Sequence, residues 1–102
     1  MARKLTSERA QKLLREVEKE REFHSYSGNR IRSVEDLHDI LIKMDEREFM
    51  FHRNNSKNDF YNWVKNVVED IKLANDIARA KTKQTTVKRV DERIRILKEL
   101  MK

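Results

Sequence analysis

The residues best suited to chemistry in this sequence are the lysines and arginines of its C-terminal quarter. No acidic residue occurs between Arg79 and Arg89. Lysine and arginine neutralise the phosphates of nucleic acids and release the counterions condensed on them. Neighbouring Thr and Gln side chains can add neutral phosphate contacts. The basic side chains that we expect to contact phosphates are Arg79, Lys81, Lys83, Lys88, Arg89, Arg93 and Arg95.

The charge of the chain is unevenly distributed. Residues 1–78 hold 15 Lys/Arg and 15 Asp/Glu, whereas residues 79–102 hold nine against three and so carry the whole net charge of +6. A neutral body with a basic end is typical of a protein that meets an anionic partner. We expect DNA or RNA to be bound through its backbone, with little sequence specificity. An acidic protein surface, or no partner at all, is the alternative. A membrane surface is disfavoured because no Trp or Phe lies in the segment.

The same segment also carries an apolar seam. Five apolar residues follow one another at spacings of 3, 4, 3 and 4, namely Val87, Val90, Ile94, Leu97 and Met101. This is the a/d spacing of a coiled coil, although two heptads are too few to hold one alone. We expect the seam to pair with the first helix or with a second copy of the chain. The alternative hypothesis is therefore a non-enzymatic assembly or adaptor protein that forms a homodimer or binds a partner helix.

No pattern of residues points to catalysis or to a metal. The histidines, His24, His38 and His52, have no metal-ligand spacing around them. Cysteine is absent, which excludes disulfides and thiolate metal sites. There is no Ser-His-Asp order and no glycine-rich phosphate loop. We expect no catalytic residue, no metal and no cofactor, and hence no enzyme.

Two further patterns allow a functional or a structural interpretation. Asn58, Asn62 and Asn66 repeat every four residues and can be seen as the base-reading face of a helix-turn-helix. A polar outer face with local capping is favoured instead. The aromatic residues Phe49, Phe51, Phe60, Tyr61 and Trp63 can be seen as a base-stacking platform, but their helical spacing favours the core.

The elements that position these residues are helices. Proline is absent and Gly28 is the one glycine, which disfavours hairpin-rich folds. We predict an all-α fold, a compact bundle of about four to six helices with a long amphipathic C-terminal helix. The 102 residues form one domain, with residues 1–78 as the neutral helical body. Residues 79–102 form a basic hinge at 79–86 and the last helix, which begins near Thr85 or Thr86.

Capping residues predict where the other helices begin. The first helix starts at Thr6 or Ser7 and runs to about Arg21. Ser33 caps a helix over residues 34–44, with Asp36 reaching back as in a capping box. Asp45, Ser56 and Asp70 cap three more segments. The segment after Ser56 carries a wide apolar face of Phe60, Trp63, Val64, Val67 and Ile71.

Residues 23–32 interrupt the helical period. Gly28-Asn29 predicts a turn, because both residues tolerate positive φ. We expect Phe23, Tyr26 and Ile31 to fold inward over an open end of the core, with a brief extended segment possible here.

Several residues between positions 23 and 78 recur in the order Phe23, Gly28, Arg32-Ser33-Val34-Glu35-Asp36-Leu37, Phe51-His52, Lys57-Asn58-Asp59-Phe60, Trp63-Val64 and Leu73-Ala74. In this order they resemble an uncharacterised small helical domain family of archaeal and bacterial proteins. That family often has Gly-Asp where this chain has Glu69-Asp70, which implies a weaker break between the two helical segments here. The resemblance supports the helical fold and implies no activity.

The sequence contains no apolar run near the roughly 20 residues that cross a bilayer, and its start has no apolar signal core. We therefore expect a cytoplasmic protein.

Overall fold

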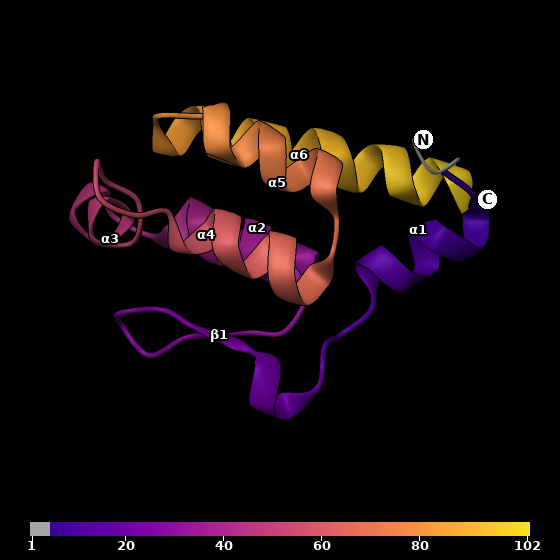
Figure 1. Cartoon of the computed structure of the whole chain (residues 1–102), viewed down its shortest axis with the longest axis horizontal. Helices are drawn as coiled ribbons and strands as arrows, with labels where there is room; N and C mark the ends of the chain where they lie inside the picture. Colours follow the sequence, from indigo (N-terminus) through magenta and orange to yellow (C-terminus); the bar gives the residue numbers. More distant parts are fainter. Residues whose placement is uncertain (1–4) are drawn as a thin grey trace.

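The computed structural model describes residues 5–102 and contains six α-helices and one short hairpin in that range (Figure 1). The helices are α1 (Ser7–Leu14), α2 (Val34–Lys43), α3 (Glu46–His52), α4 (Asp59–Trp63), α5 (Ile71–Arg79) and α6 (Lys83–Leu100). Strands β1 (Phe23–His24) and β2 (Arg30–Ile31) form the hairpin, Lys19–Arg21 is a 3₁₀ turn, and Val64–Val68 is a π-helical turn that continues α4. The predicted all-α bundle with a long C-terminal helix is confirmed.

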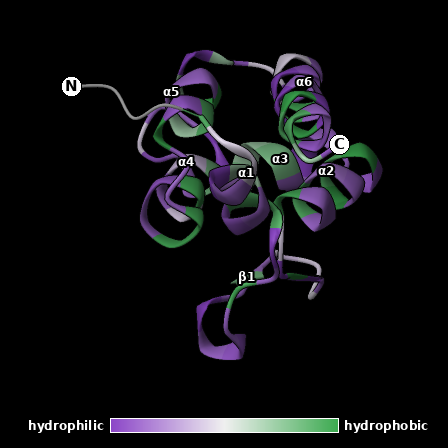
Figure 2. Ribbon diagram, turned by 90° about the vertical axis from the view of Figure 1, so that its right-hand side faces the viewer, coloured by the Kyte–Doolittle hydropathy of each residue, from purple (hydrophilic) through white to green (hydrophobic). Residues whose placement is uncertain are grey.

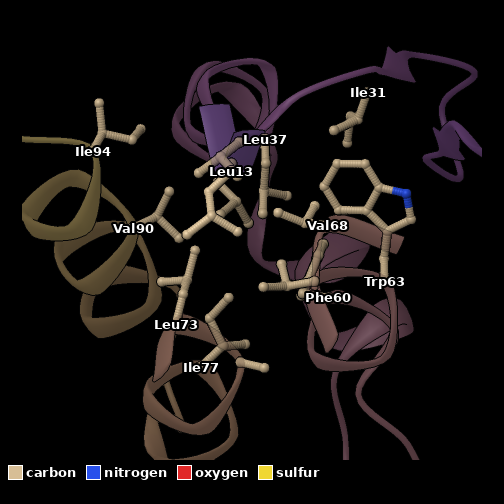
Figure 3. Packing of buried hydrophobic residues seen from close by; sticks show 14 of the residues in the cluster. Leu13, Ile31, Leu37, Phe60, Trp63, Val68, Leu73, Ile77, Val90 and Ile94 are labelled. Carbon is tan, nitrogen blue, oxygen red and sulfur yellow. The ribbon is translucent and has the colours of Figure 1, made fainter. Parts of the chain in front are cut away.

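The helices pack in two layers around one core. α5 and α6 form an antiparallel pair above α4 and α2, and α1 lies at one end between the layers (Figures 1 and 2). The radius of gyration of 13.0 Å is that of a compact domain of about 100 residues. Figure 3 shows Leu13, Leu37, Leu73 and Val90 converging from α1, α2, α5 and α6, and all four side chains are buried.

Short polar side chains cap most helices at their first turn. Ser33 Oγ accepts a hydrogen bond from the Asp36 N–H at 3.1 Å, and Asp45 Oδ1 accepts one from the Glu48 N–H at 2.8 Å. The Asp36 carboxylate reaches back to the Arg32 N–H at 3.0 Å, one residue earlier than a capping box requires. Each cap satisfies a backbone donor that the helix leaves free.

The prediction that Ser56 caps the central helix is wrong, because Asn58 does so. Asn58 Oδ1 accepts a hydrogen bond from the Tyr61 N–H at 3.1 Å. The turn before it is closed by the Asn54 N–H, which donates to the Lys57 carbonyl at 2.9 Å, and by an antiparallel bridge between Arg53 and Asn58. The central helix therefore begins at Asp59, two residues later than a cap at Ser56 would give.

The first helix is shorter than predicted and ends at Leu14 rather than near Arg21. Arg15 is already extended, with φ −70° and ψ 160°. Two residues later the Val17 N–H donates to the Arg32 carbonyl at 2.8 Å. This long-range backbone bond draws the chain alongside the segment that leads into α2, so the helical pattern of residues 15–21 is overridden.

The hairpin confirms the predicted turn and corrects one of its side chains. Gly28 has φ +93°, and the Gly28 N–H donates to the Ser25 carbonyl at 2.9 Å. Ile31 is fully buried and Phe23 is half-buried, as expected, but Tyr26 is 72% exposed. Tyr26 stands at the tip of the hairpin, where its backbone rather than its ring is bonded to the body of the protein.

A carboxylate–guanidinium pair ties the entry of the hairpin to its return strand. Arg30 donates from Nε and Nη2 to the two carboxylate oxygens of Glu22, both at 2.9 Å. These hydrogen bonds hold the pKa of Glu22 below its usual value and raise the pKa of Arg30. Both side chains are therefore used within the hairpin segment.

The junction between α4 and α5 contains a left-handed residue. Glu69 has φ 66° and ψ 30°, and its N–H donates to the Val64 carbonyl at 2.8 Å. The predicted apolar face of this segment is broken there: Ile71 is 53% exposed, because the π turn and Glu69 change the helical phase before it. The predicted start of a new helix at Asp70 is confirmed by its bond from the Leu73 N–H at 3.1 Å.

Candidate nucleic-acid interface

The predicted hinge over residues 79–86 is a sharp turn confined to Ala80–Thr82. Thr82 Oγ1 accepts a hydrogen bond from the Thr85 N–H at 3.1 Å, so α6 begins at Lys83, two or three residues earlier than predicted. Ala80, the first residue of the turn, is buried. The turn lies at the same end of the molecule as α3 (Figure 1), since Arg53 Nε donates to the Ala80 carbonyl at 3.2 Å.

Five of the nine basic residues in 79–102 form ion pairs with acidic residues of the chain itself. Four of these pairs are on the surface: Arg89–Glu92 at 2.9 Å, Arg95–Asp91 at 3.1 Å, Lys98–Glu35 at 3.1 Å and Lys102–Glu99 at 3.1 Å. Surface pairs of this kind contribute little to stability, about 0–1 kcal/mol each. They do, however, neutralise part of the charge that the sequence places on α6.

The fifth pair is buried and removes Arg93 from the candidate interface. Arg93 donates from Nε and Nη2 to Asp70 at 2.8 and 2.9 Å. The side chains of Arg93 and Asp70 are 11% and 1% exposed. The prediction that Arg93 contacts phosphates is therefore wrong, because its guanidinium holds α6 against the start of α5.

The remaining basic residues of the segment have no carboxylate partner in the described part of the chain. We call these four residues the turn cations: Arg79, Lys81, Lys83 and Lys88. Arg79, Lys81 and Lys88 are exposed, whereas Lys83 is half-buried and donates to the Ile42 carbonyl at 3.2 Å. All four lie at the end of α5, in the turn or in the first two turns of α6. The unneutralised charge is thus concentrated near the turn rather than spread along the helix.

A groove of about 360 Å³ runs between α5 and α6 beside these residues. It is lined by Lys72, Asp76, Arg79, Ala80, Thr85, Arg89, Glu92, Arg93 and Ile96. Lys72 is paired with Asp76 at 2.7 Å, and Arg89 with Glu92. Arg79 is the one cation of the groove without such a pair among the residues described, and it is the last residue of α5, next to the turn.

A second groove of about 520 Å³ lies between α1 and the π turn, and two of the arginines that line it, Arg9 and Arg21, bond backbone carbonyls. Arg9 Nη2 donates to the Glu69 carbonyl at 3.1 Å, and Arg21 Nη2 donates to the Asn66 carbonyl at 3.0 Å. Cations at the carbonyl end of a helical segment complement its dipole. These two arginines therefore cap the segment that ends at Glu69.

The apolar seam of α6 packs mainly within the chain. Val90, Ile94 and Leu97 are buried in a core shared with α1 and α2, and Figure 3 shows Val90 pointing into it from α6. Val87 is half-buried, and Met101 is 42% exposed. Pairing with the first helix, one of the two expected alternatives, is what the structure shows. Only Val87 and Met101 remain within reach of a second chain.

Asn58 and His52 are used for local structure. Asn58 is a helix cap, while Asn62 and Asn66 are exposed on the short α4 and the π turn. His52 is buried: its Nδ1 lies 2.9 Å from the Asp59 carboxylate, and its Nε2 accepts a hydrogen bond from the Tyr26 N–H at 3.0 Å. Among residues 5–102 no group of three His, Cys, Asp or Glu side chains can hold a metal. No helix in this range is long and apolar enough to cross a membrane.

The structure contains an exposed aromatic pair that the sequence patterns do not predict. Phe49, Phe60 and Trp63 are buried as expected. Phe51 is 47% exposed, and its ring centroid lies 4.8 Å from that of Tyr26. The signal that could have revealed Tyr26 is its setting in Ser-Tyr-Ser-Gly-Asn, where polar turn formers surround it and imply a loop tip.

The chain matches no protein family model, no curated protein and no solved structure in three comparisons. Its function is therefore inferred from the geometry and charge of its own residues.

Proposed function

We propose that this protein binds nucleic acid backbones through the turn cations Arg79, Lys81, Lys83 and Lys88. The observation that carries the proposal is the absence of carboxylate partners around these four residues in the described structure, while the other basic residues of 79–102 are paired. A paired cation must give up its carboxylate before it binds a phosphate. An unpaired one loses only water and counterions.

The first turn of α6 adds to the positive potential at this place. Its N-terminal N–H groups point toward the turn, and no acidic residue lies in the first helical turn to offset them. A helix N-terminus carries about half a positive charge and favours phosphate. Lysine side chains that contact phosphates carry no sequence information. We therefore expect little sequence specificity.

The proposal is tested by titrating labelled 20-nucleotide DNA with the protein at two salt concentrations. In one variant Arg79, Lys81 and Lys88 are replaced by Gln, and in the matched control Arg95, Lys98 and Lys102 are replaced by Gln. Both variants lower the net charge from +6 to +3. Lys83 is retained in both, so that its bond to the Ile42 carbonyl is kept.

We expect the first variant to bind much more weakly and with a shallower salt dependence. The slope of log affinity against log salt should fall by about 0.7–0.9 for each phosphate that the variant no longer neutralises. The control should keep more of its affinity, because its three residues already face carboxylates. Equal weakening in the two variants, or binding that does not respond to salt, would refute the proposal.

Light scattering of the free protein tests the adaptor and homodimer hypothesis in parallel, since a monomer has no seam contact with a second copy.

A further inference from the structure

Two exposed aromatic rings meet at the end of the molecule where the turn cations lie. Tyr26 comes from the tip of the hairpin and Phe51 from α3, 25 residues later in the sequence. Their centroids are 4.8 Å apart and their planes are inclined by 50°. The exposed fractions are 72% for Tyr26 and 47% for Phe51. Tyr26 is the most exposed of the large apolar and aromatic side chains in the described chain.

The position of Tyr26 is fixed by polar contacts that do not involve its ring. Its N–H donates to His52 Nε2 at 3.0 Å, and His52 is held in turn by Asp59. The next residue, Ser27, donates from its N–H and its hydroxyl to the Glu48 carboxylate, at 3.0–3.1 Å. The exposed ring therefore stands on an anchored loop. A preorganised aromatic ring loses little conformational entropy when a ligand stacks on it.

One cation lies over the pair and has a carboxylate partner of its own. Lys57 Nζ lies 4.4 Å from the centroid of the Phe51 ring and 3.1 Å from the Asp59 carboxylate. Arg53, two residues after Phe51, donates to the carbonyls of Ala78 and Ala80 at 3.4 and 3.2 Å. These bonds connect the end of α3 to the turn that carries Arg79 and Lys81. Figure 1 shows α3 and this turn at the same end of the molecule.

Exposed aromatic rings next to backbone-binding cations are how proteins bind single-stranded nucleic acids without sequence preference. In a duplex the base faces are stacked on each other and cannot reach a protein ring. We propose that Tyr26 and Phe51 stack on unpaired bases, so that the ligand of this protein is single-stranded DNA or RNA. The inference rests on the proposed backbone binding by the turn cations and adds the class of nucleic acid to it.

The test is fluorescence anisotropy with four labelled probes of equal length: a DNA oligothymidylate, an RNA oligouridylate, a DNA duplex, and an abasic DNA strand with the same phosphates but no bases. The variants are Tyr26→Ala, Phe51→Ala and Tyr26→Phe. The matched control is Met50→Ala, which removes a 51%-exposed apolar side chain of α3 without an aromatic face. Far-UV circular dichroism checks that each variant is folded.

We expect the wild-type protein to bind both single strands more tightly than the duplex and the abasic strand. Tyr26→Ala and Phe51→Ala should each weaken single-strand binding by about fivefold or more, the effect that follows from removing one base–aromatic stack. Tyr26→Phe and Met50→Ala should bind as the wild type does. The DNA and RNA arms show which of the two sugars is preferred. Because the Phe51 ring also contacts His52 and Lys57, Phe51→Ala can affect stability, and Tyr26→Ala is the decisive variant.

Three results would overturn the inference and leave the proposed function standing. Salt-dependent binding that is equal for single strand, duplex and abasic strand would leave the turn cations as the binding site and remove the stacking role. Unchanged single-strand binding in Tyr26→Ala would do the same. Loss of self-association in Tyr26→Ala, with nucleic acid binding intact, would assign the rings to a contact between copies. Failure of all four probes to bind would refute both proposals.

Discussion

The buried ion pair between Asp70 and Arg93 gives the sharpest prediction about stability. The Asp70 carboxylate accepts two bonds from the guanidinium and one from the Leu73 N–H, which begins α5. Replacing Arg93 by Met leaves this carboxylate with its bond from the Leu73 N–H but without its counter-charge. Replacing Asp70 by Asn leaves the guanidinium almost fully covered, with only a neutral partner. Each change removes one charge from a site that water hardly reaches.

Removal of one partner from a buried pair costs about 3–5 kcal/mol, because it leaves a buried charge without its counter-charge. A domain of this size has a free energy of unfolding of about 5–15 kcal/mol. We therefore expect Arg93→Met and Asp70→Asn each to lower that free energy by about 3 kcal/mol. The double variant should lose less than the sum, by about 2 kcal/mol, since residues in direct contact couple by about 0.5–3 kcal/mol.

The measurement is urea denaturation followed by far-UV circular dichroism for the wild type, both single variants and the double variant. Arg95→Met is the control, because Arg95 is 79% exposed and its pair with Asp91 should contribute less than about 1 kcal/mol. Additive effects in the double variant, or an Arg93→Met variant as stable as the control, would show that the pair does not join α5 and α6 as the structure indicates.

Two further predictions concern single residues. Glu69→Gly should raise the free energy of unfolding by about 1 kcal/mol, because glycine adopts the left-handed conformation of Glu69 without steric cost. The gain is measured as a higher melting temperature. Glu69→Ala, which keeps the Cβ, should give no such gain, and equal effects of the two substitutions would contradict this account. The Arg30 hydrogen bonds hold the pKa of Glu22 below its ordinary value of 4.5, so the pair stabilises the folded state above that pH and the contribution is lost as the pH falls below it. The stability of Glu22→Gln should fall less steeply than that of the wild type under acid conditions, and identical pH profiles in thermal melts would exclude a role for the pair.

Local sequence signals predicted the helices well because their caps lie next to them. Ser33, Asp45 and Asp70 each bond an N–H three residues further on, a spacing that is visible in the sequence. The end of the first helix could not be predicted in this way. It depends on the bond from the Val17 N–H to the Arg32 carbonyl, and nothing near Arg15 in the sequence signals that contact.

The sequence predicts where the basic residues of the candidate site lie, but it does not predict which of them form ion pairs. The acid-free run from Arg79 to Arg89 marked the correct part of the chain. Which cations have a carboxylate partner depends on contacts between distant parts of the chain. Lys98 pairs with Glu35, and Arg93 pairs with Asp70. The aromatic pair has the same origin, since Tyr26 and Phe51 are brought together by a hairpin whose anchor, His52, is buried for reasons of tertiary packing.

The contact of Trp63 with the start of the hairpin segment has a practical consequence. Trp63 is the only tryptophan of the chain, and its indole N–H donates to the Arg21 carbonyl at 2.9 Å. Its ring also meets Phe23 edge-on, with centroids 6.2 Å apart. Release of residues 18–31 from the helices would expose this indole to solvent and shift its fluorescence emission, while the helical circular dichroism signal would hardly change. The protein thus contains a built-in optical reporter that separates loosening of the segment carrying Tyr26 from unfolding of the helices.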